Sequence, residues 1–394
     1  MASGFTTSGS DFDAQFIRRE FFREGTLWGW GQNSYGTLGN GSASSSNKFS
    51  SPIIATGGGL IWNSIYTDGS AGNVVIGYKT NGSVWCWGQN LSNQLGTGTA
   101  TTYTAPTQMS PVAYRTNWKK IAVTSTHSVG IWNNTMWSVG ANSYGQLGDG
   151  TIATKSTWTT QIAGLDWSDV SVCRSASSAI KTDGTLWTWG RNNYGQLADN
   201  TTTNKSSPVQ IYGGGTNWKY LQKGGFGSQA AIKTDGTLWL WGHNDAGQLG
   251  VNDITNRSSP TQIIGGGNWK QTSFGGWSTA TSFTGGIKSD NTLWMWGANV
   301  YGQLGNSSTT KVSSPVQIIG GGTNWKQVST GNQHTAAVKT DGTLWTWGRN
   351  NYGQLGDNTI VNKSSPIQTI AGGTNWKSVQ IAYHTTLALT DNNV

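Results

Sequence analysis

Charged side chains are scarce in this sequence: Asp, Glu, Lys and Arg make up 11% of its 394 residues, against roughly 25% in an average soluble domain. Glycine and tryptophan take their place, with 57 and 23 copies, alongside many Ser, Thr and Asn residues. A chain of this length with 35% hydrophobic residues is long enough to bury a large core. The composition predicts a polar but mostly uncharged surface around an aromatic interior.

Cysteine is nearly absent. Cys86 and Cys173 lie in strand-like segments of different repeats, and their spacing excludes the common metal and redox motifs. We expect two buried free thiols. A disulfide between them is the open alternative, so the sequence leaves the redox compartment undetermined.

Long apolar runs are also missing. No window reaches the roughly 18 apolar residues that a membrane-spanning helix requires. Residues 1–25 lack the apolar core of a signal peptide. We therefore expect neither membrane insertion nor a secretion signal.

A repeated tryptophan-containing run that ends in glycine is the main structural signal. It occurs seven times, at intervals of 50 to 57 residues. This period is typical of propeller blades and lies far above the ~34 residues of common helical repeats. The seven runs are LWGWG (27–31), VWCWG (84–88), MWSVG (136–140), LWTWG (186–190), LWLWG (238–242), LWMWG (293–297) and LWTWG (344–348).

Each repeat contains four short runs rich in Val, Ile, Thr and Trp, bounded by turn residues, which predicts four strands. Pairs such as Asp341-Gly342 precede the tryptophan run and predict a tight two-residue hairpin with positive φ. Because side chains alternate along a strand, Trp345 and Trp347 share one face and Leu344 lies on the other. Both faces of a blade are therefore expected to pack against neighbouring blades.

The two ends of the chain each supply half a repeat. The C-terminal stretch TNWKSVQIAYHTTLALTDNNV has no tryptophan run after it, and REGTLWGWG near the N-terminus has no strands before it. Pairing the halves removes exposed strand edges. We therefore predict an all-β fold, a closed seven-bladed β-propeller of four-stranded blades whose N- and C-terminal strands share one blade. It occupies residues 25–394, after an N-terminal extension of residues 1–24.

The run HTAAVKTDGTLWTWGRNNYGQLG, residues 334–356, resembles the repeat of the regulator of chromosome condensation (RCC1) family, and the resemblance covers residues 25–394. It implies a seven-bladed propeller, in agreement with the repeat count. It implies no single function, since the family includes a nucleotide-exchange factor, a plant ultraviolet-B photoreceptor and many binding domains. The photoreceptor would require repeated Gly-Trp-Arg-His-Thr motifs, and GGWSTA (275–280) lacks Arg and His; the exchange factor would require a protruding insertion. Both activities are disfavoured.

A glycine loop follows each tryptophan run. Its first glycine is Asn93 in one repeat, and its second is Ala198 in another. Since Asn tolerates a left-handed backbone better than Ala does, we predict positive φ at the first position, as at Gly353, and ordinary geometry at Ala198. No Lys-Ser/Thr pair follows the loop and no helix is predicted there, so a phosphate-binding loop is disfavoured.

Candidate catalytic and metal-ligating residues are dispersed. His127, His334 and His384 align at one repeat position, so we expect packed, hydrogen-bonded side chains in separate blades. His243 lies in a loop, where a polar, Asn-like role is expected. Most acidic residues fall in turns or at loop ends and do not pair in a cleft. We predict no catalytic residue, no metal site, no cofactor and no enzymatic activity.

Basic residues outnumber acidic ones, and the formal net charge is +8. They recur at three repeat positions, which a propeller turns into rings of positive charge that attract a polyanion, either nucleic acid or an acidic glycan. A solubilising role is the alternative, because no aromatic–basic cluster marks a groove. The rings are Lys119, Lys219, Lys270, Lys326 and Lys377 after the first-strand tryptophan; Lys181, Lys233 and Lys339 before the Asp-Gly turn; and Lys205, Arg257, Lys311 and Lys363 at the fourth strand.

Residues 1–24 carry a cluster of large apolar side chains outside the repeats. Ser10 is a candidate N-cap with Asp13 three residues later, and the apolar residues follow at helical spacing. We predict that this segment docks the propeller onto a protein partner, such as a larger virion assembly; folding back onto the ring is the open alternative. The candidate docking residues are Phe12, Phe16, Ile17, Arg18, Arg19, Phe21 and Phe22.

Two functional hypotheses remain. An uncharged Gly/Ser/Thr/Asn surface without a secretion signal favours a phage attachment or decoration protein that recognises its target through blade loops. That hypothesis places the protein on a virion or an extracellular surface rather than in the cytoplasm. The alternative is an intracellular interaction hub of the RCC1 type that binds a GTPase or chromatin.

Overall fold

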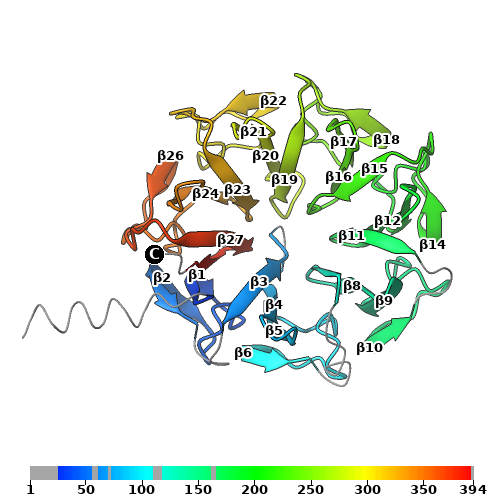
Figure 1. Cartoon of the computed structure of the whole chain (residues 1–394), viewed down its shortest axis with the longest axis horizontal. Coiled ribbons are helices and arrows are strands. Elements are labelled where there is room, and N and C mark those ends of the chain that lie inside the picture. Colours follow the sequence, from blue (N-terminus) through cyan, green and yellow to red (C-terminus); the bar gives the residue numbers. More distant parts are fainter. Residues whose placement is uncertain (1–24, 56–60, 70–71, 110–117, 161–165, 392–394) are drawn as a thin grey trace, which may run out of the picture.

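Seven four-stranded antiparallel sheets form a closed ring in the computed structural model (Figure 1), which describes residues 25–55, 61–69, 72–109, 118–160 and 166–391. Each sheet is a blade whose strands succeed one another from the axis of the ring to its rim. The predicted all-β, seven-bladed propeller is confirmed.

The radial position of a strand follows its order in the repeat (Figure 1). The innermost strands are β27 (Trp376–Ala382), β3 (Trp62–Thr67), β7 (Lys120–Val123), β11 (Trp167–Cys173), β15 (Trp218–Leu221), β19 (Trp269–Gly275) and β23 (Trp325–Thr330). The second strands are β28 (Thr385–Thr390), β4 (Val74–Lys79), β8 (His127–Trp132), β12 (Ala176–Lys181), β16 (Ser228–Lys233), β20 (Phe283–Lys288) and β24 (His334–Lys339). The third strands are β1 (Leu27–Asn33), β5 (Val84–Gly88), β9 (Thr135–Gly140), β13 (Leu186–Gly190), β17 (Leu238–Gly242), β21 (Leu293–Gly297) and β25 (Leu344–Gly348). The outermost strands are β2 (Ser44–Ile54), β6 (Tyr103–Gln108), β10 (Lys155–Thr160), β14 (Lys205–Gln210), β18 (Arg257–Gln262), β22 (Val312–Gln317) and β26 (Lys363–Gln368).

The ring closes in the blade that joins the two ends of the chain. Its strand order is β2-β1-β28-β27. Strand β1 pairs with β28, from Leu27 opposite Leu389 to Gly31 opposite Thr385. The predicted sharing of one blade by N- and C-terminal strands is confirmed.

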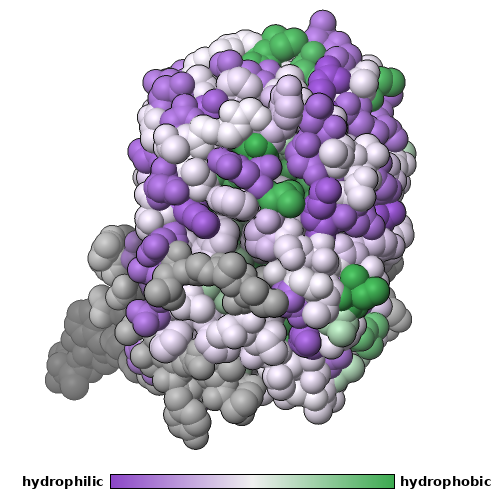
Figure 2. Space-filling view, turned by 90° about the vertical axis from the view of Figure 1, so that its right-hand side faces the viewer, coloured by the Kyte–Doolittle hydropathy of each residue, from purple (hydrophilic) through white to green (hydrophobic). Residues whose placement is uncertain are grey.

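The two ends of the ring differ in what they carry. At one end the first strands begin, and we name it the lysine end after Lys119, Lys219, Lys270, Lys326 and Lys377 at those positions. The other end carries the glycine loops that follow the third strands, and we name it the loop end. Seen from its side (Figure 2), the ring shows mostly hydrophilic and intermediate residues with small separate hydrophobic patches, as the composition predicts.

Tryptophans of the third strands pack between blades. Trp345 and Trp347 face the cluster that contains Trp325, and Leu344 belongs to the cluster on the opposite side of the blade. The predicted assignment of faces is confirmed. The Trp347 indole also donates to the Gln303 carbonyl in the glycine loop of the preceding blade, at 2.9 Å. Trp30, Trp87, Trp189, Trp241 and Trp296 make the same bond.

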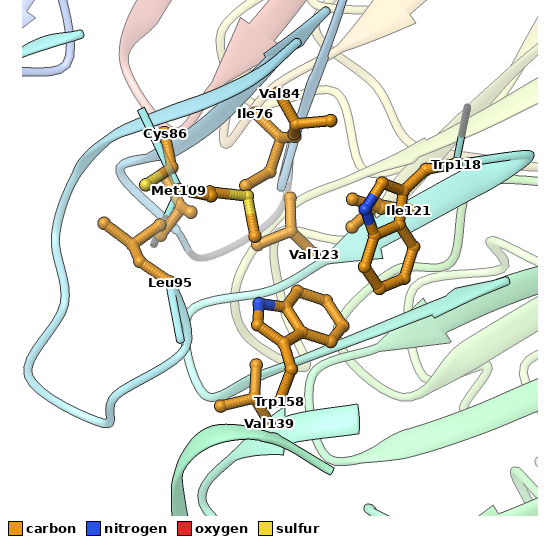
Figure 3. Packing of buried hydrophobic residues seen from close by; sticks show 11 residues of the cluster. Ile76, Val84, Cys86, Leu95, Met109, Trp118, Ile121, Val123, Val139 and Trp158 are labelled. Atoms are coloured by element: carbon orange, nitrogen blue, oxygen red, sulfur yellow. The ribbon is translucent and has the colours of Figure 1, made fainter. Parts of the chain in front are cut away.

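The blade of β7 to β10 packs differently, because Val139 stands where six other blades have the second tryptophan. Trp158 of the outermost strand β10 lies beside Val139, in one cluster with Leu95 and Trp118 (Figure 3). The Trp118 and Trp158 ring centroids are 5.1 Å apart. The aromatic content of this interface is therefore kept, but a different strand supplies it.

The Asp-Gly turns depart from the prediction. Gly184 donates to the Lys181 carbonyl and Lys181 donates to the Thr185 carbonyl, so three residues connect the strands rather than two. Only the glycine has positive φ, +80° at Gly184. The Asp183 carboxylate accepts the Thr185 amide at 2.9 Å and hydroxyl at 2.7 Å. This is a type I turn closed by a glycine bulge, and aspartate is suited to it because its side chain caps the turn.

One prediction for the glycine loops was wrong. Gly353 and Asn93 have φ of +73° and +60°, as predicted, but Ala198 also has a positive φ of +52°. The Ala198 carbonyl accepts the Tyr212 amide at 2.7 Å, and its methyl group is buried in a cluster with Trp241. These contacts hold an alanine in the conformation that its glycine counterparts adopt without strain.

The predicted docking segment, with Phe12, Phe16, Ile17, Arg18, Arg19, Phe21 and Phe22, lies outside the described residues, so docking and folding back remain predictions. Within the described residues, no helix combines the length and the hydropathy that a membrane span requires.

Candidate binding site at the lysine end

The lysine ring before the Asp-Gly turn is engaged inside the blades. Lys233 Nζ lies 4.7 Å from the ring centroid of Trp218 and 4.2 Å from that of Trp239. Such cation–π contacts stabilise a fold by about 0.5–2 kcal/mol each. Lysines held in the same way are Lys79, Lys181, Lys288 and Lys339. This ring is structural.

The ring at the fourth strand is largely paired with aspartates of the glycine loops. Its charge is therefore mostly compensated where it stands. The ion pairs are Lys155–Asp149 (3.6 Å), Lys205–Asp199 (3.9 Å), Lys363–Asp357 (3.8 Å) and Arg257–Asp253.

The ring that names the lysine end faces solvent. Lys119, Lys219 and Lys270 line, together with Lys120, a recess of about 560 Å³. Asp169 is the acidic residue of this lining, and its carboxylate pairs with Lys120 at 2.6 Å. Four lysines and one aspartate thus line the recess, and such an excess of one sign attracts anions.

The recess continues into a cavity on the axis. Lys120, Leu221 and Gln222 line both spaces. The cavity has a volume of about 230 Å³ and is lined by residues of all seven innermost strands. Gln222, Gln271 and Gln380 contribute side-chain amides to a lining that also contains four valines and several Ser and Thr residues. The axis therefore offers polar partners inside a partly apolar wall.

Lys223 crosses the axis near the loop end. It follows β15, and its Nζ lies 3.4 Å from Thr67 Oγ1 and 3.4 Å from the Ile381 carbonyl, in blades on the other side of the ring (Figure 1). A Cβ atom at Gly69 would lie 2.2 Å from the Thr330 carbonyl oxygen and 2.6 Å from this Nζ, so the backbone at Gly69 packs closely against both. Burial lowers the pKa of Lys223 to about 8, and the Asp68 carboxylate opposes part of that shift.

Sequence reasoning missed Lys223. Its counterparts at the same inner-strand position include Thr330 and Ile381 in other blades. The available signal was a charged residue at an inner-strand position where other repeats have uncharged ones.

Two histidines occupy the predicted repeat position. His127 Nε2 lies 2.9 Å from Ser177 Oγ, and His334 Nε2 lies 3.0 Å from Thr386 Oγ1, each across a blade interface. Burial lowers the pKa of His127 to about 3, so the side chain is neutral at ordinary pH. The prediction of packed, hydrogen-bonded side chains is confirmed for both.

His384 does not share that position, which corrects the alignment. Gly31 pairs with Thr385 as Gly348 pairs with His334, so Thr385 is the counterpart of His334. His384 lies one residue earlier, in the turn with Tyr383, and their ring centroids are 4.1 Å apart. The similar runs HTT and HTA hide this shift of register in the sequence.

The remaining histidine and the cysteines are buried. His243 lies 3.1 Å from the Asp245 carboxylate and 2.6 Å from the Gln248 amide, which agrees with the predicted polar role. Cys86 and Cys173 are buried free thiols, as predicted, and burial raises the pKa of each to about 12. Among the described residues, no group of three or more His, Cys, Asp or Glu side chains is placed to hold a metal ion.

Aromatic–basic contacts form at the loop end, which the sequence did not predict. The Arg349 guanidinium carbon lies 5.0 Å from the Tyr301 ring centroid and 5.7 Å from that of Tyr352. Arg191 lies 4.9 Å from the Tyr144 ring centroid. Tyr352 lies three residues after Arg349 in the same loop, whereas Tyr301 and Tyr144 come from the glycine loop of the preceding blade, and these two contacts are not visible as a local run of residues.

Comparison with solved structures shows the same fold. Yeast RCC1 (Prp20), in its complex with Kap60, superposes with a TM-score of 0.80 at 16% identity, over 100% of this chain and 96% of that one. A second structure of Prp20p from Saccharomyces cerevisiae gives a TM-score of 0.79 at 17% identity, over 96% and 95% of the two chains.

Two curated proteins illustrate the sequence similarity. The ultraviolet-B receptor UVR8 of Arabidopsis thaliana is 29% identical over 325 residues, which is 79% of this chain and 72% of UVR8. The human E3 ubiquitin-protein ligase HERC2 is 27% identical over 346 residues, which is 85% of this chain but 7% of HERC2. This chain thus corresponds to a small part of that ligase.

The regulator of chromosome condensation (RCC1) repeat model matches more than half of the chain. A second RCC1 repeat model matches residues 325–354. The ranges matched by the first are 24–56, 81–131, 183–223, 235–281, 290–338 and 341–389. Seven blades, the repeated tryptophan run and these matches together show that the chain belongs to the RCC1 repeat family.

Proposed function

We propose that this propeller is a non-enzymatic binding module that holds a protein partner by an acidic surface at its lysine end. The carrying observation is the convergence of Lys119, Lys120, Lys219 and Lys270 on one recess, with Asp169 as the acidic residue of the lining. Most residues of the other two basic rings have partners within the protein, Lys311 being an exposed exception, so this ring presents the largest group of charges to solvent.

The relatives support a protein partner over the virion hypothesis. Yeast RCC1 (Prp20) is described as bound to Kap60, and Prp20p is described by its binding properties to Gsp1p and histones. None of the relatives named above is a virion protein. The anchor of the phage hypothesis, residues 1–24, lies outside the described residues, and its remaining basis is the composition of the surface and the lack of a secretion signal. We therefore carry forward the RCC1-type interaction module.

A labelled Glu-rich peptide tests the proposal, with a Gln-rich peptide of equal length as its uncharged counterpart. The Lys119→Gln/Lys219→Gln/Lys270→Gln variant is expected to bind the Glu-rich peptide about tenfold more weakly, since three exposed charge contacts of about 0.5 kcal/mol each amount to roughly that factor. Added salt is expected to weaken binding to the unmodified protein, because these charges are exposed.

The matched control removes three paired lysines at the fourth strand. Lys155→Gln/Lys205→Gln/Lys363→Gln loses the same charge but leaves the recess intact, so it should bind almost as the unmodified protein does. Equal losses in both triple variants would overturn the proposal, because net charge alone would then account for binding. Tight binding of a DNA duplex without binding of the Glu-rich peptide would also overturn it, in favour of nucleic acid.

A further inference from the structure

The axial cavity below the recess is built from groups that suit one small anion. Its volume of about 230 Å³ is far above the roughly 10–15 Å³ that one water molecule requires. It joins the recess through Lys120, Leu221 and Gln222, so a ligand that enters from the lysine end passes four ammonium groups first.

Lys223 provides the positive charge at the inner end of this cavity. Its ammonium group has three N–H donors, and its contacts to Thr67 Oγ1 and the Ile381 carbonyl are both 3.4 Å. These distances lie beyond the usual range of N–H···O bonds, 2.7–3.2 Å. The ammonium group therefore retains donor capacity for a stronger acceptor.

Two side-chain amides of the lining are also available as donors. The Gln222 Oε1 accepts the Thr272 amide at 2.7 Å, which fixes the side chain, and its Nε2 makes no hydrogen bond within the described residues. Gln380, on β27, lines the same cavity and likewise has no side-chain hydrogen bond within that part of the chain. An ammonium group and two amides match the acceptor pattern of a carboxylate.

The Asp68 carboxylate, at the loop end, limits the net positive charge of the cavity. Asp68 is itself part of the cavity lining, and its Oδ2 accepts the Ser125 amide at 2.9 Å. Together Asp68 and Lys223 are neutral, so the excess positive charge comes from the recess above. A single carboxylate is therefore favoured over a multiply charged phosphate.

We propose that the axial cavity is a socket for one carboxylate of the partner polypeptide, which reaches Lys223 through the lysine end. This inference rests on the proposed function, since the recess would hold the acidic surface from which the carboxylate enters. The carboxylate comes from a chain terminus or from a Glu side chain, and the two sources share the same chemistry.

Three labelled peptides with one acidic sequence test the socket. The first ends in a free carboxylate after alanine, the second is its C-terminal amide, and the third is an amide whose last residue is Glu. Because a hydrogen bond to a charged group is worth about 1.5–3 kcal/mol, the first peptide should bind at least about tenfold more tightly than the second. Equal or tighter binding of the third would assign the carboxylate to a side chain, which also supports the socket.

Lys223→Met should abolish the preference of the first peptide over the second and leave the affinity of the amide unchanged. If Lys223→Met fails to fold, two other variants take its place: Lys223→Arg, which keeps the charge, and Gln380→Leu, which changes the opposite wall. Each should reduce the preference of the protein for the first peptide over the second. Equal affinities of all three peptides for the unmodified protein would overturn the socket, as would an unchanged preference in a folded Lys223→Met variant.

The recess variant separates this inference from the proposed function. Lys119→Gln/Lys219→Gln/Lys270→Gln should weaken all three peptides alike and keep their ratios. If it weakens none of them, the proposed function fails. If it weakens all of them and the peptides never differ from one another, only the socket fails.

Discussion

Trp158 and Val139 lie side by side and have exchanged roles within one blade (Figure 3). Val139 stands at the position of the second tryptophan of the third strand, and Trp158 stands where the fourth strands of other blades have a proline such as Pro208. A Cβ atom at Gly96 would meet Trp158 Nε1 at 2.3 Å, as one at Gly356 would meet Trp30 Nε1 at 2.8 Å. Trp158 and Trp30 therefore fill equivalent spaces at their own blade interfaces, Trp158 from a fourth strand and Trp30 from a third strand.

Trp158→Ala should lower the free energy of unfolding by about 3–5 kcal/mol, because it empties a buried aromatic site. Val139→Trp alone should also destabilise, because it overpacks an occupied interface. The double variant Val139→Trp/Trp158→Pro restores the pattern of the other blades and should recover most of the loss. Chemical denaturation of Val139→Trp, Trp158→Pro and the double variant gives the coupling energy.

In the double variant Val139→Trp/Trp158→Pro, the indole at position 139 should also gain a hydrogen bond. Trp158 Nε1 is buried without a hydrogen-bond partner, whereas the other buried indoles of this kind donate to a carbonyl of the preceding blade. Additive destabilisation by the two single changes would contradict the exchange.

Ala198 and Gly356 form a natural pair for testing the strain of the loop. Gly356→Ala should destabilise by about 2 kcal/mol, because φ is +63° there and a Cβ would lie 2.8 Å from Trp30 Nε1. Ala198→Gly relieves the strain at φ +52° but loses a buried methyl group worth about 0.8 kcal/mol. Its net effect should lie between zero and a gain of about 1 kcal/mol, measured in the same denaturation series. Equal destabilisation by the two changes would show that backbone strain is not what separates these positions.

His127 should make the fold sensitive to acid. Its pKa of about 3 lies below the ordinary 6.5, so the unfolded chain takes up a proton in this range while the folded chain does not. Stability is therefore lost as pH falls from about 6.5 towards 3, by about 2 kcal/mol at pH ~5. His127→Gln should flatten this part of the profile of melting temperature against pH. His243→Gln is the control, since Asp245 opposes the effect of burial on the pKa of His243; an equal change in both variants would contradict the assignment to His127.

Lys223 should make the stability of the fold depend on pH in the alkaline range. Its folded pKa of about 8 lies below the ordinary 10.5, so the unfolded chain holds more protons between these values and stability rises with pH there. The stability of the unmodified protein relative to Lys223→Met should increase by at most about 3 kcal/mol between pH ~8 and ~10.5. Lys326→Met, at an exposed lysine of the lysine end, is the control for loss of one charge. A constant difference across this range would show that Lys223 is not held in a desolvated site.

Most of the fold could be predicted from the sequence because the same unit recurs along the chain. Fifty-residue spacing, alternating strands and half-repeats at the two ends are local patterns, and they sufficed for seven blades and for the shared blade. The faces of Trp347 and Leu344 followed from strand alternation alone. Because the unit recurs, each repeat supported the same prediction of a four-stranded blade.

What failed depended on single residues whose environment is set by strand pairing and by contacts with residues distant in the sequence. Ala198 is held at positive φ by its bond to Tyr212 and its packing in a cluster with Trp241, and neither is visible from the residue type. His384 was misaligned by one position because only strand pairing fixes the register.

The sequence by itself determined the blade, because short-range alternation and turn chemistry specify it. Only the tertiary structure decided which lysines are held by partners within the protein and which present their charge to solvent. It inserts one lysine ring between tryptophans, pairs another with loop aspartates, and brings Lys119, Lys219 and Lys270 to one recess. It also places Lys223 across the axis from Thr67, a contact between residues 156 positions apart. Closure of the ring creates these neighbours, and no local pattern encodes which blades will face one another across it.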